Sequence, residues 1–142
     1  MANLVVHFEI HASDPEAAIT FYSDLLDWTF TEAMPGQYWV IGTGEGARTG
    51  PDTPGFGING GLVQRRGPKP EVGGPVTGAD LVIAVDDVDA IHARGIELGG
   101  VDAVAPMDMP GVGRMAYLLD PDGNVFGFLN PVTSDGVSQM GM

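Results

Sequence analysis

Apolar and polar residues alternate near the start of the chain, in residues 5–10. In a strand, successive side chains point to opposite faces, so His7 and Glu9 share one face. The opposite face is apolar and carries Val6, Phe8 and Ile10. The pattern therefore predicts a strand whose apolar face packs on a helix and whose ionisable face borders a cavity.

A helix is expected directly after this strand, with Ser13 or Asp14 as its cap and Pro15 in its first turn. Apolar residues recur there at helical spacing and form one stripe. They are Ala18, Phe21, Tyr22, Leu25 and Leu26. Shorter apolar segments predict three more strands, at residues 29–34, 37–41 and 58–63, and a long loop rich in glycine covers residues 42–57.

The same order of elements returns in the second half, at an offset of roughly 74 residues. A strand at 79–85 precedes a helix at 88–98, and strands follow at 101–104, 114–119 and 125–129. The sequence thus predicts one α+β domain built from two βαβββ modules, which form a curled, barrel-like mixed sheet with helices outside. The expected parts are module one (4–64), a linker (65–78), module two (79–131) and a loose polar tail (132–142).

Charge and composition narrow the possible partners. The net charge is −13, which disfavours nucleic acid as a partner and favours solubility. We see neither an apolar run long enough for a membrane span nor a signal peptide. Cysteine is absent, which fits a cytoplasmic protein. Arg65, Arg66 and Lys69 cluster in the linker, where they either recruit an anionic ligand or simply keep the linker solvated.

Motifs in both halves resemble the vicinal oxygen chelate superfamily, which includes glyoxalase I, extradiol dioxygenases, and fosfomycin- and bleomycin-resistance proteins. The first half contributes His7, Asp14, Pro15, Phe21, Tyr22, Leu25, Leu26 and Trp28. The second half contributes Val85, Asp86, Asp87, Val88, Asp120, Pro121, Asp122, Gly123, Asn124 and Phe126. The resemblance covers residues 5–131 and implies a glyoxalase-like fold and a homodimer.

The resemblance also implies four metal-ligand positions, one on each of four strands facing the cavity. They correspond to His7, to a residue within 58–62 where Asn59 is the candidate, to Asp80 and to Gly127. Gly127 has no side chain where the family places a carboxylate. We therefore expect no cofactor; the alternative is a divalent metal (Zn, Ni, Mn or Fe) on His7 and Asp80, with Glu9 as a third ligand.

His7 and Glu9 are the candidate catalytic residues, because an imidazole beside a carboxylate suits proton transfer. Each also has a structural interpretation: His7 satisfied by Glu9 or Asp80, and Glu9 paired with His7 or Arg114. His11 is expected in a loop. The candidate ligand-binding residues are Trp39, Asn59, Asp80, Arg114 and Tyr117.

The sequence leaves three alternative hypotheses for the function. The first is a binding protein of the bleomycin-resistance type, which holds a small organic molecule in the sheet cavity without the full metal site. The second is an enzyme of the lyase, isomerase or dioxygenase type that uses His7, Glu9 and Asp80 with a divalent cation. The third is a component that works through assembly alone.

Overall fold

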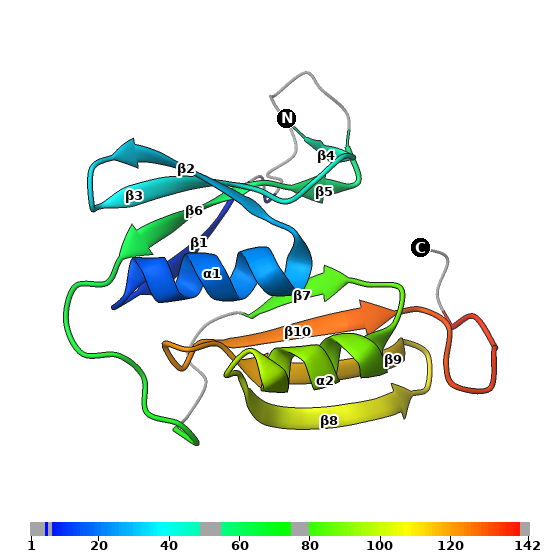
Figure 1. Cartoon of the computed structure of the whole chain (residues 1–142). Helices are drawn as coiled ribbons and strands as arrows, with labels where there is room; N and C mark the ends of the chain where they lie inside the picture. The colour runs from blue at the N-terminus through cyan, green and yellow to red at the C-terminus, as the bar shows by residue number, and fades with distance from the viewer. Residues whose placement is uncertain (1–4, 6, 49–54, 75–79, 140–142) are drawn as a thin grey trace. The chain divides into compact units, whose positions relative to one another are not determined.

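The computed structural model describes residues 5, 7–48, 55–74 and 80–139 of the 142-residue chain. The chain divides into two compact units, residues 1–69 and 70–142, and each is described by itself (Figure 1). Some parts of the expected elements lie outside the described residues. These are Val6, Ala79, part of the 42–57 loop, the end of the linker and the end of the tail.

The first unit holds one helix and a four-stranded mixed sheet with the order β1-β6-β3-β2. β1 and β6 are parallel, and the other neighbours are antiparallel. The loop after β3 carries the short pair β4 and β5. The elements are β1 (Phe8–Ala12), α1 (Pro15–Leu26), β2 (Thr29–Met34), β3 (Tyr38–Gly42), β4 (Ala47–Arg48), β5 (Gly57–Ile58) and β6 (Gly60–Gln64).

Capping residues fix both ends of α1. The side chain of Asp14 accepts a hydrogen bond from the backbone N–H of Ala17 (3.2 Å), and Pro15 occupies the first turn. Asp27 closes the helix in the left-handed conformation, at φ 58°. The buried stripe of α1 packs on one face of the sheet, and Tyr22 stacks on Trp28 with ring centroids 5.4 Å apart.

The second unit repeats this arrangement. Its four-stranded sheet has the order β7-β10-β9-β8, again with one parallel pair, β7 and β10. α2 covers one face of this sheet, and Asp87 caps the helix by accepting from Ala90 N–H (3.0 Å). The elements are β7 (Leu81–Ala84), α2 (Val88–Glu97), β8 (Val101–Met109), β9 (Gly113–Leu119) and β10 (Val125–Asn130).

The turn between β9 and β10 is built around the buried carboxylate of Asp120. Its oxygens accept hydrogen bonds from the backbone N–H groups of Asp122 (2.8 Å) and Asn124 (2.9 Å) and from the Asn124 amide (3.0 Å). Gly123 supplies the positive φ of 86° that the turn requires. Residues 120–124 thus form a tight turn that leads from β9 into β10.

The α+β class and the two βαβββ modules are confirmed. Hydrogen bonding joins the described strands into two separate four-stranded sheets and one short pair. None of the helices in the described ranges is both long and apolar enough to cross a membrane.

Three local expectations were wrong. β1 extends to Ala12, so His11 lies in a strand rather than a loop, because β6 offers pairing partners up to Gln64. β8 continues beyond the expected strand of residues 101–104 to Met109, since register shifts around Val104 restore its pairing with β9.

The third correction concerns the tail, which is not loose between residues 131 and 139. Ser134 N–H donates to the carboxylate of Asp108 (2.9 Å), and Gly111 N–H donates to the Gln139 side chain (3.0 Å). A further bridge joins Val132 and Ser138. This segment therefore folds back on the hairpin of β8 and β9.

Candidate functional site

Three polar side chains meet on the open face of the first sheet, which is the face opposite α1. The phenol oxygen of Tyr38 lies 3.2 Å from Nε2 of His7. The same nitrogen lies 3.4 Å from a carboxylate oxygen of Glu9. The side chains of His7 and Glu9 retain 46% and 45% exposure, so a small molecule can reach both. We call these three residues the His7 cluster.

Strand register brings the His7 cluster together. Glu9 in β1 pairs with Gly61 in β6, and Gly61 pairs with Val40 in β3. Tyr38 precedes Val40 by two residues, so its side chain lies on the same face and reaches diagonally across β6. A Cβ atom at Gly61 would overlap the phenol oxygen and ring of Tyr38. Glycine at position 61 therefore allows Tyr38 to reach His7.

Burial and the charge of Glu9, in that order, raise the pKa of Tyr38 above its ordinary value. The phenol is thus protonated at neutral pH and can donate to Nε2 of His7 when the imidazole proton is on Nδ1. When Nε2 carries the proton, it faces the carboxylate of Glu9 instead. Nε2 of His7 can therefore accept a hydrogen bond from Tyr38 or, when it carries the proton, face Glu9 as a donor.

Tyr38 is the member of the His7 cluster that sequence reasoning missed. In the sequence, the adjacent Gly60 and Gly61 indicate either a bulge or a close approach to the backbone of this strand. They could not indicate which side chain makes that approach, because Tyr38 is distant from Gly61 in sequence.

Trp39 and Asn59 do not join the His7 cluster. Trp39 pairs with the buried Leu62, so its side chain lies on the α1 face of the sheet. The side-chain oxygen of Asn59 accepts hydrogen bonds from Thr43 N–H (2.9 Å) and from its hydroxyl (3.1 Å). Asn59 thereby ties the segment before β6 to the end of β3.

Tyr117 lies on the open face of the second sheet, where it covers Gly127. The two residues pair directly across β9 and β10, and a Cβ at Gly127 would approach the Tyr117 ring to 2.5 Å. Asp80 is exposed and precedes β7 on the same face as Val82, which also pairs with Gly127. The open face of this unit therefore presents Tyr117 among apolar neighbours, with Asp80 at one end.

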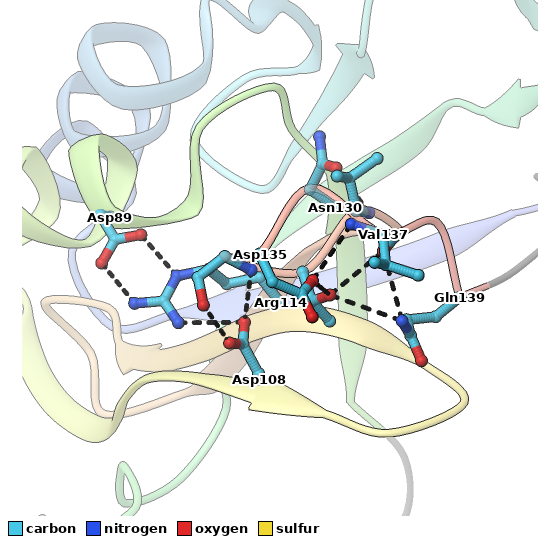
Figure 2. A network of polar contacts seen from close by, with 10 residues as sticks. Asp89, Asp108, Arg114, Asn130, Asp135, Val137 and Gln139 are labelled. Atoms are coloured by element: carbon cyan, nitrogen blue, oxygen red, sulfur yellow. Dashed lines mark hydrogen bonds and ion pairs between the residues drawn. The ribbon is translucent and has the colours of Figure 1, made fainter.

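Arg114 lies on the α2 face of the second sheet and is held by two carboxylates (Figure 2). Its guanidinium makes a bidentate pair with Asp89 of α2 (2.6 and 2.8 Å) and contacts Asp108 of β8 at 3.2 Å. Asp108 also accepts from the hydroxyl of Ser134. These contacts make Arg114 a link between helix, sheet and tail, and Glu9 pairs with His7 instead of Arg114.

Hydrogen bonds from Arg114 lower the pKa of Asp89, and those from Ser134, followed by Arg114, lower the pKa of Asp108. In return, hydrogen bonds from the carboxylates raise the pKa of Arg114. All three groups are therefore charged at neutral pH.

The residues present do not fit the metal site that the resemblance implies. Tyr117 fills the space above Gly127, where the family places a carboxylate, and Tyr38 fills the space above the equivalent glycine of the first unit, Gly61. Across the described ranges, no three His, Cys, Asp or Glu residues gather as a metal site. A stable transition-metal site normally needs at least three protein ligands.

Residues 4–128 match the family model described as Glyoxalase/Bleomycin resistance protein/Dioxygenase superfamily. The chain belongs to this superfamily. The match confirms the glyoxalase-like fold expected from the sequence.

The chain is similar to curated proteins that are longer than itself. CFP32 of Mycobacterium tuberculosis, a proposed glyoxylase, is 31% identical over 126 residues, which cover 87% of this chain and 42% of CFP32. The anthracycline biosynthesis protein DnrV of Streptomyces peucetius is 29% identical, covering 95% of this chain and 50% of DnrV. The chain therefore spans about half the length of these relatives.

Among solved structures, the fosfomycin resistance protein FosX of Listeria monocytogenes, complexed with Mn(II) and dihydroxypropylphosphonic acid, has a TM-score of 0.67. Its sequence identity is 14%, with 91% of this chain and 90% of that chain covered. This likeness concerns the fold.

Proposed function

We propose that this chain binds a small organic molecule on the open face of its first sheet, without a metal ion. The observation that carries the proposal is the His7 cluster, in which an imidazole, a phenol and a carboxylate meet on an accessible surface. Binding sites commonly combine apolar surface with a few converging polar groups. Val40 and Val63, on the same face, supply apolar surface beside the cluster.

The relatives support a small organic ligand. The family description includes bleomycin resistance, and DnrV is named for anthracycline biosynthesis. An anthracycline is therefore a reasonable first probe.

Calorimetry with an anthracycline, in buffer containing EDTA, tests the proposal. We expect binding without metal and a roughly tenfold or greater loss of affinity in His7→Ala, because the polar contact is removed. His92→Ala is the matched control, since His92 also pairs with a carboxylate, that of Asp102 at 2.7 Å, but on α2. Failure to bind, equal loss in both variants, or a strict need for added Mn²⁺ would contradict the proposal.

Metal-independent proton transfer is a second candidate function. It is favoured by the position of His7 Nε2, which faces both a phenol and a carboxylate. Exchange of a proton next to a ligand carbonyl in D₂O, followed by NMR, would detect it. Exchange that persists in His7→Ala would exclude this role for His7.

We also propose that the chain forms a homodimer in solution and is located in the cytoplasm. Gel filtration with light scattering tests the first, and a monomeric mass would contradict it.

A further inference from the structure

We propose that Glu9 and Tyr38 make the His7 cluster selective for ligands that donate hydrogen bonds. Such ligands carry hydroxyl or ammonium groups, and the cluster disfavours ligands with a carboxylate or phosphate. This inference rests on the proposed function, because it names the ligand class of the same site.

The charge on the open face is negative. The residues that register places on this face include Glu9, His11, Thr31, Tyr38, Val40 and Val63, together with Gly61, and His7 joins them through its contacts with Tyr38 and Glu9. Among these residues, Glu9 carries the one formal charge at neutral pH when histidine is neutral. The whole chain adds a net charge of −13. Anions therefore meet an unfavourable potential, and cations a favourable one.

Arg65, a basic residue of the linker, lies near the end of β1. Its guanidinium donates to the backbone oxygen of His11 (3.0 Å), and its backbone N–H donates to that of Ala12 (2.8 Å). These bonds hold Arg65 at the end of the strand. The guanidinium of Arg65 therefore binds the backbone at the end of β1.

Glu9 and Tyr38 offer hydrogen-bond acceptors to a ligand. The carboxylate of Glu9 accepts hydrogen bonds and donates none. When the phenol of Tyr38 donates to His7, its remaining lone pairs can accept from a ligand. Two acceptors thus flank one imidazole. Hydroxyl and ammonium groups complement them, whereas a carboxylate would place acceptor against acceptor.

The test uses three probes on one aromatic frame: benzylamine, benzyl alcohol and benzoate. Each is titrated into the ¹⁵N-labelled full chain at neutral pH, and the backbone amide signals of Glu9 and Gly61 are followed by NMR. We expect the amine and the alcohol to shift these signals at lower concentration than the benzoate. The amine should bind most tightly because it adds attraction to Glu9.

Two variants connect the preference to its residues. Tyr38→Phe removes only the hydroxyl and should weaken binding of the alcohol roughly two- to tenfold, as expected for one neutral hydrogen bond. Glu9→Gln should remove the preference for the amine over the alcohol. Glu16→Gln, which removes the same charge from the exposed first turn of α1, is the control and should leave the order of the probes unchanged.

The outcomes separate the inference from the proposed function. Binding of the benzoate at Glu9 and Gly61 as tightly as the amine would overturn the inference and leave small-molecule binding in place. A preference for the amine that survives in Glu9→Gln would also overturn it. If none of the three probes shifts these amide signals, both the inference and the proposed site fall.

Discussion

Gly61 and Gly127 each lie under a tyrosine ring, but the two rings reach them from different strand positions. Tyr117 pairs directly with Gly127, whereas Tyr38 lies two residues before the partner of Gly61. The direct partner of Gly61 in β3 is Val40, whose side chain cannot hydrogen-bond to a histidine. At the scale of single residues, the diagonal approach of Tyr38 distinguishes the first unit from the second and creates the His7 cluster.

Replacing Gly61 with alanine should displace Tyr38, because the new Cβ would overlap its ring. We expect a loss of about 1–3 kcal/mol in the free energy of unfolding, as for overpacking in general. Denaturant unfolding measures this loss, and the NMR signals of the His7 ring should change together with it. Gly57→Ala is the control, since a Cβ there has open space. Equal stability of the two variants would contradict the prediction.

Replacing Glu9 with glutamine should lower the pKa of Tyr38 towards its ordinary value, because one of the two causes of the raised pKa is the charge of Glu9. The change should be partial, since burial remains. Spectrophotometric titration of the phenols measures it, and Tyr38→Phe identifies which transition belongs to Tyr38. An unchanged titration in Glu9→Gln would show that the two groups do not interact.

At the scale of elements, the second unit is tied together by ions rather than by apolar contact alone. Arg114 of β9 joins Asp89 of α2 to Asp108 of β8, and Asp108 in turn holds the tail through Ser134 (Figure 2). Exposed ion pairs contribute little singly, but Arg114 is only 23% exposed and its pairing with Asp89 is bidentate.

Acid should loosen this network in a predictable direction. The pKa values of Asp89 and Asp108 are lowered in the folded chain. Their stabilisation is therefore present above the ordinary carboxyl pKa of about 3.9 and lost as pH falls through the lower folded values. Asp108→Asn should reduce stability at neutral pH and make the decline of Tm shallower between roughly pH 5 and pH 2.

The control for this acid series is Asp24→Asn, which removes the same charge from an exposed position of α1. It separates loss of the network from the general effect of net charge. A decline as steep in Asp108→Asn as in the unmodified chain would refute the role given to the network.

At the scale of the whole molecule, the sequence repeats one module and carries a large negative charge. The chain has nineteen acidic residues and six basic ones. One of the basic residues, Arg114, is already paired with acidic neighbours. Self-repulsion of this kind favours solubility and destabilises the compact state.

Added salt should therefore stabilise the chain. Screening shortens the range of repulsion from about 30 Å at 0.01 M salt to about 10 Å at 0.1 M. We expect Tm to rise over this range, as measured by circular dichroism. Sucrose at matched osmolality is the control, since it leaves charges unscreened. A Tm that is constant or falls with salt would mean that repulsion does not limit stability.

The sequence by itself determined the modules, because periodicity, caps and turns are local. Asp14, one of the two predicted candidates, caps α1; Asp87 caps α2, and Asp120 builds the turn before β10. His7 and Glu9 were also predicted to share a face, since strand alternation decides this.

Tertiary structure decided what lies next to that face. In the first sheet, register across three strands brought Tyr38 over Gly61 and placed Trp39 on the opposite side. In the second unit, the packing of α2 on the sheet brought Asp89 to Arg114. The physical reason is that these contacts join residues distant in sequence, and the pairing of strands and the packing of helix on sheet that fix them are properties of the folded unit. Local pattern therefore specified the candidate residues, and only the pairing of strands and the packing of helix on sheet decided which of them meet.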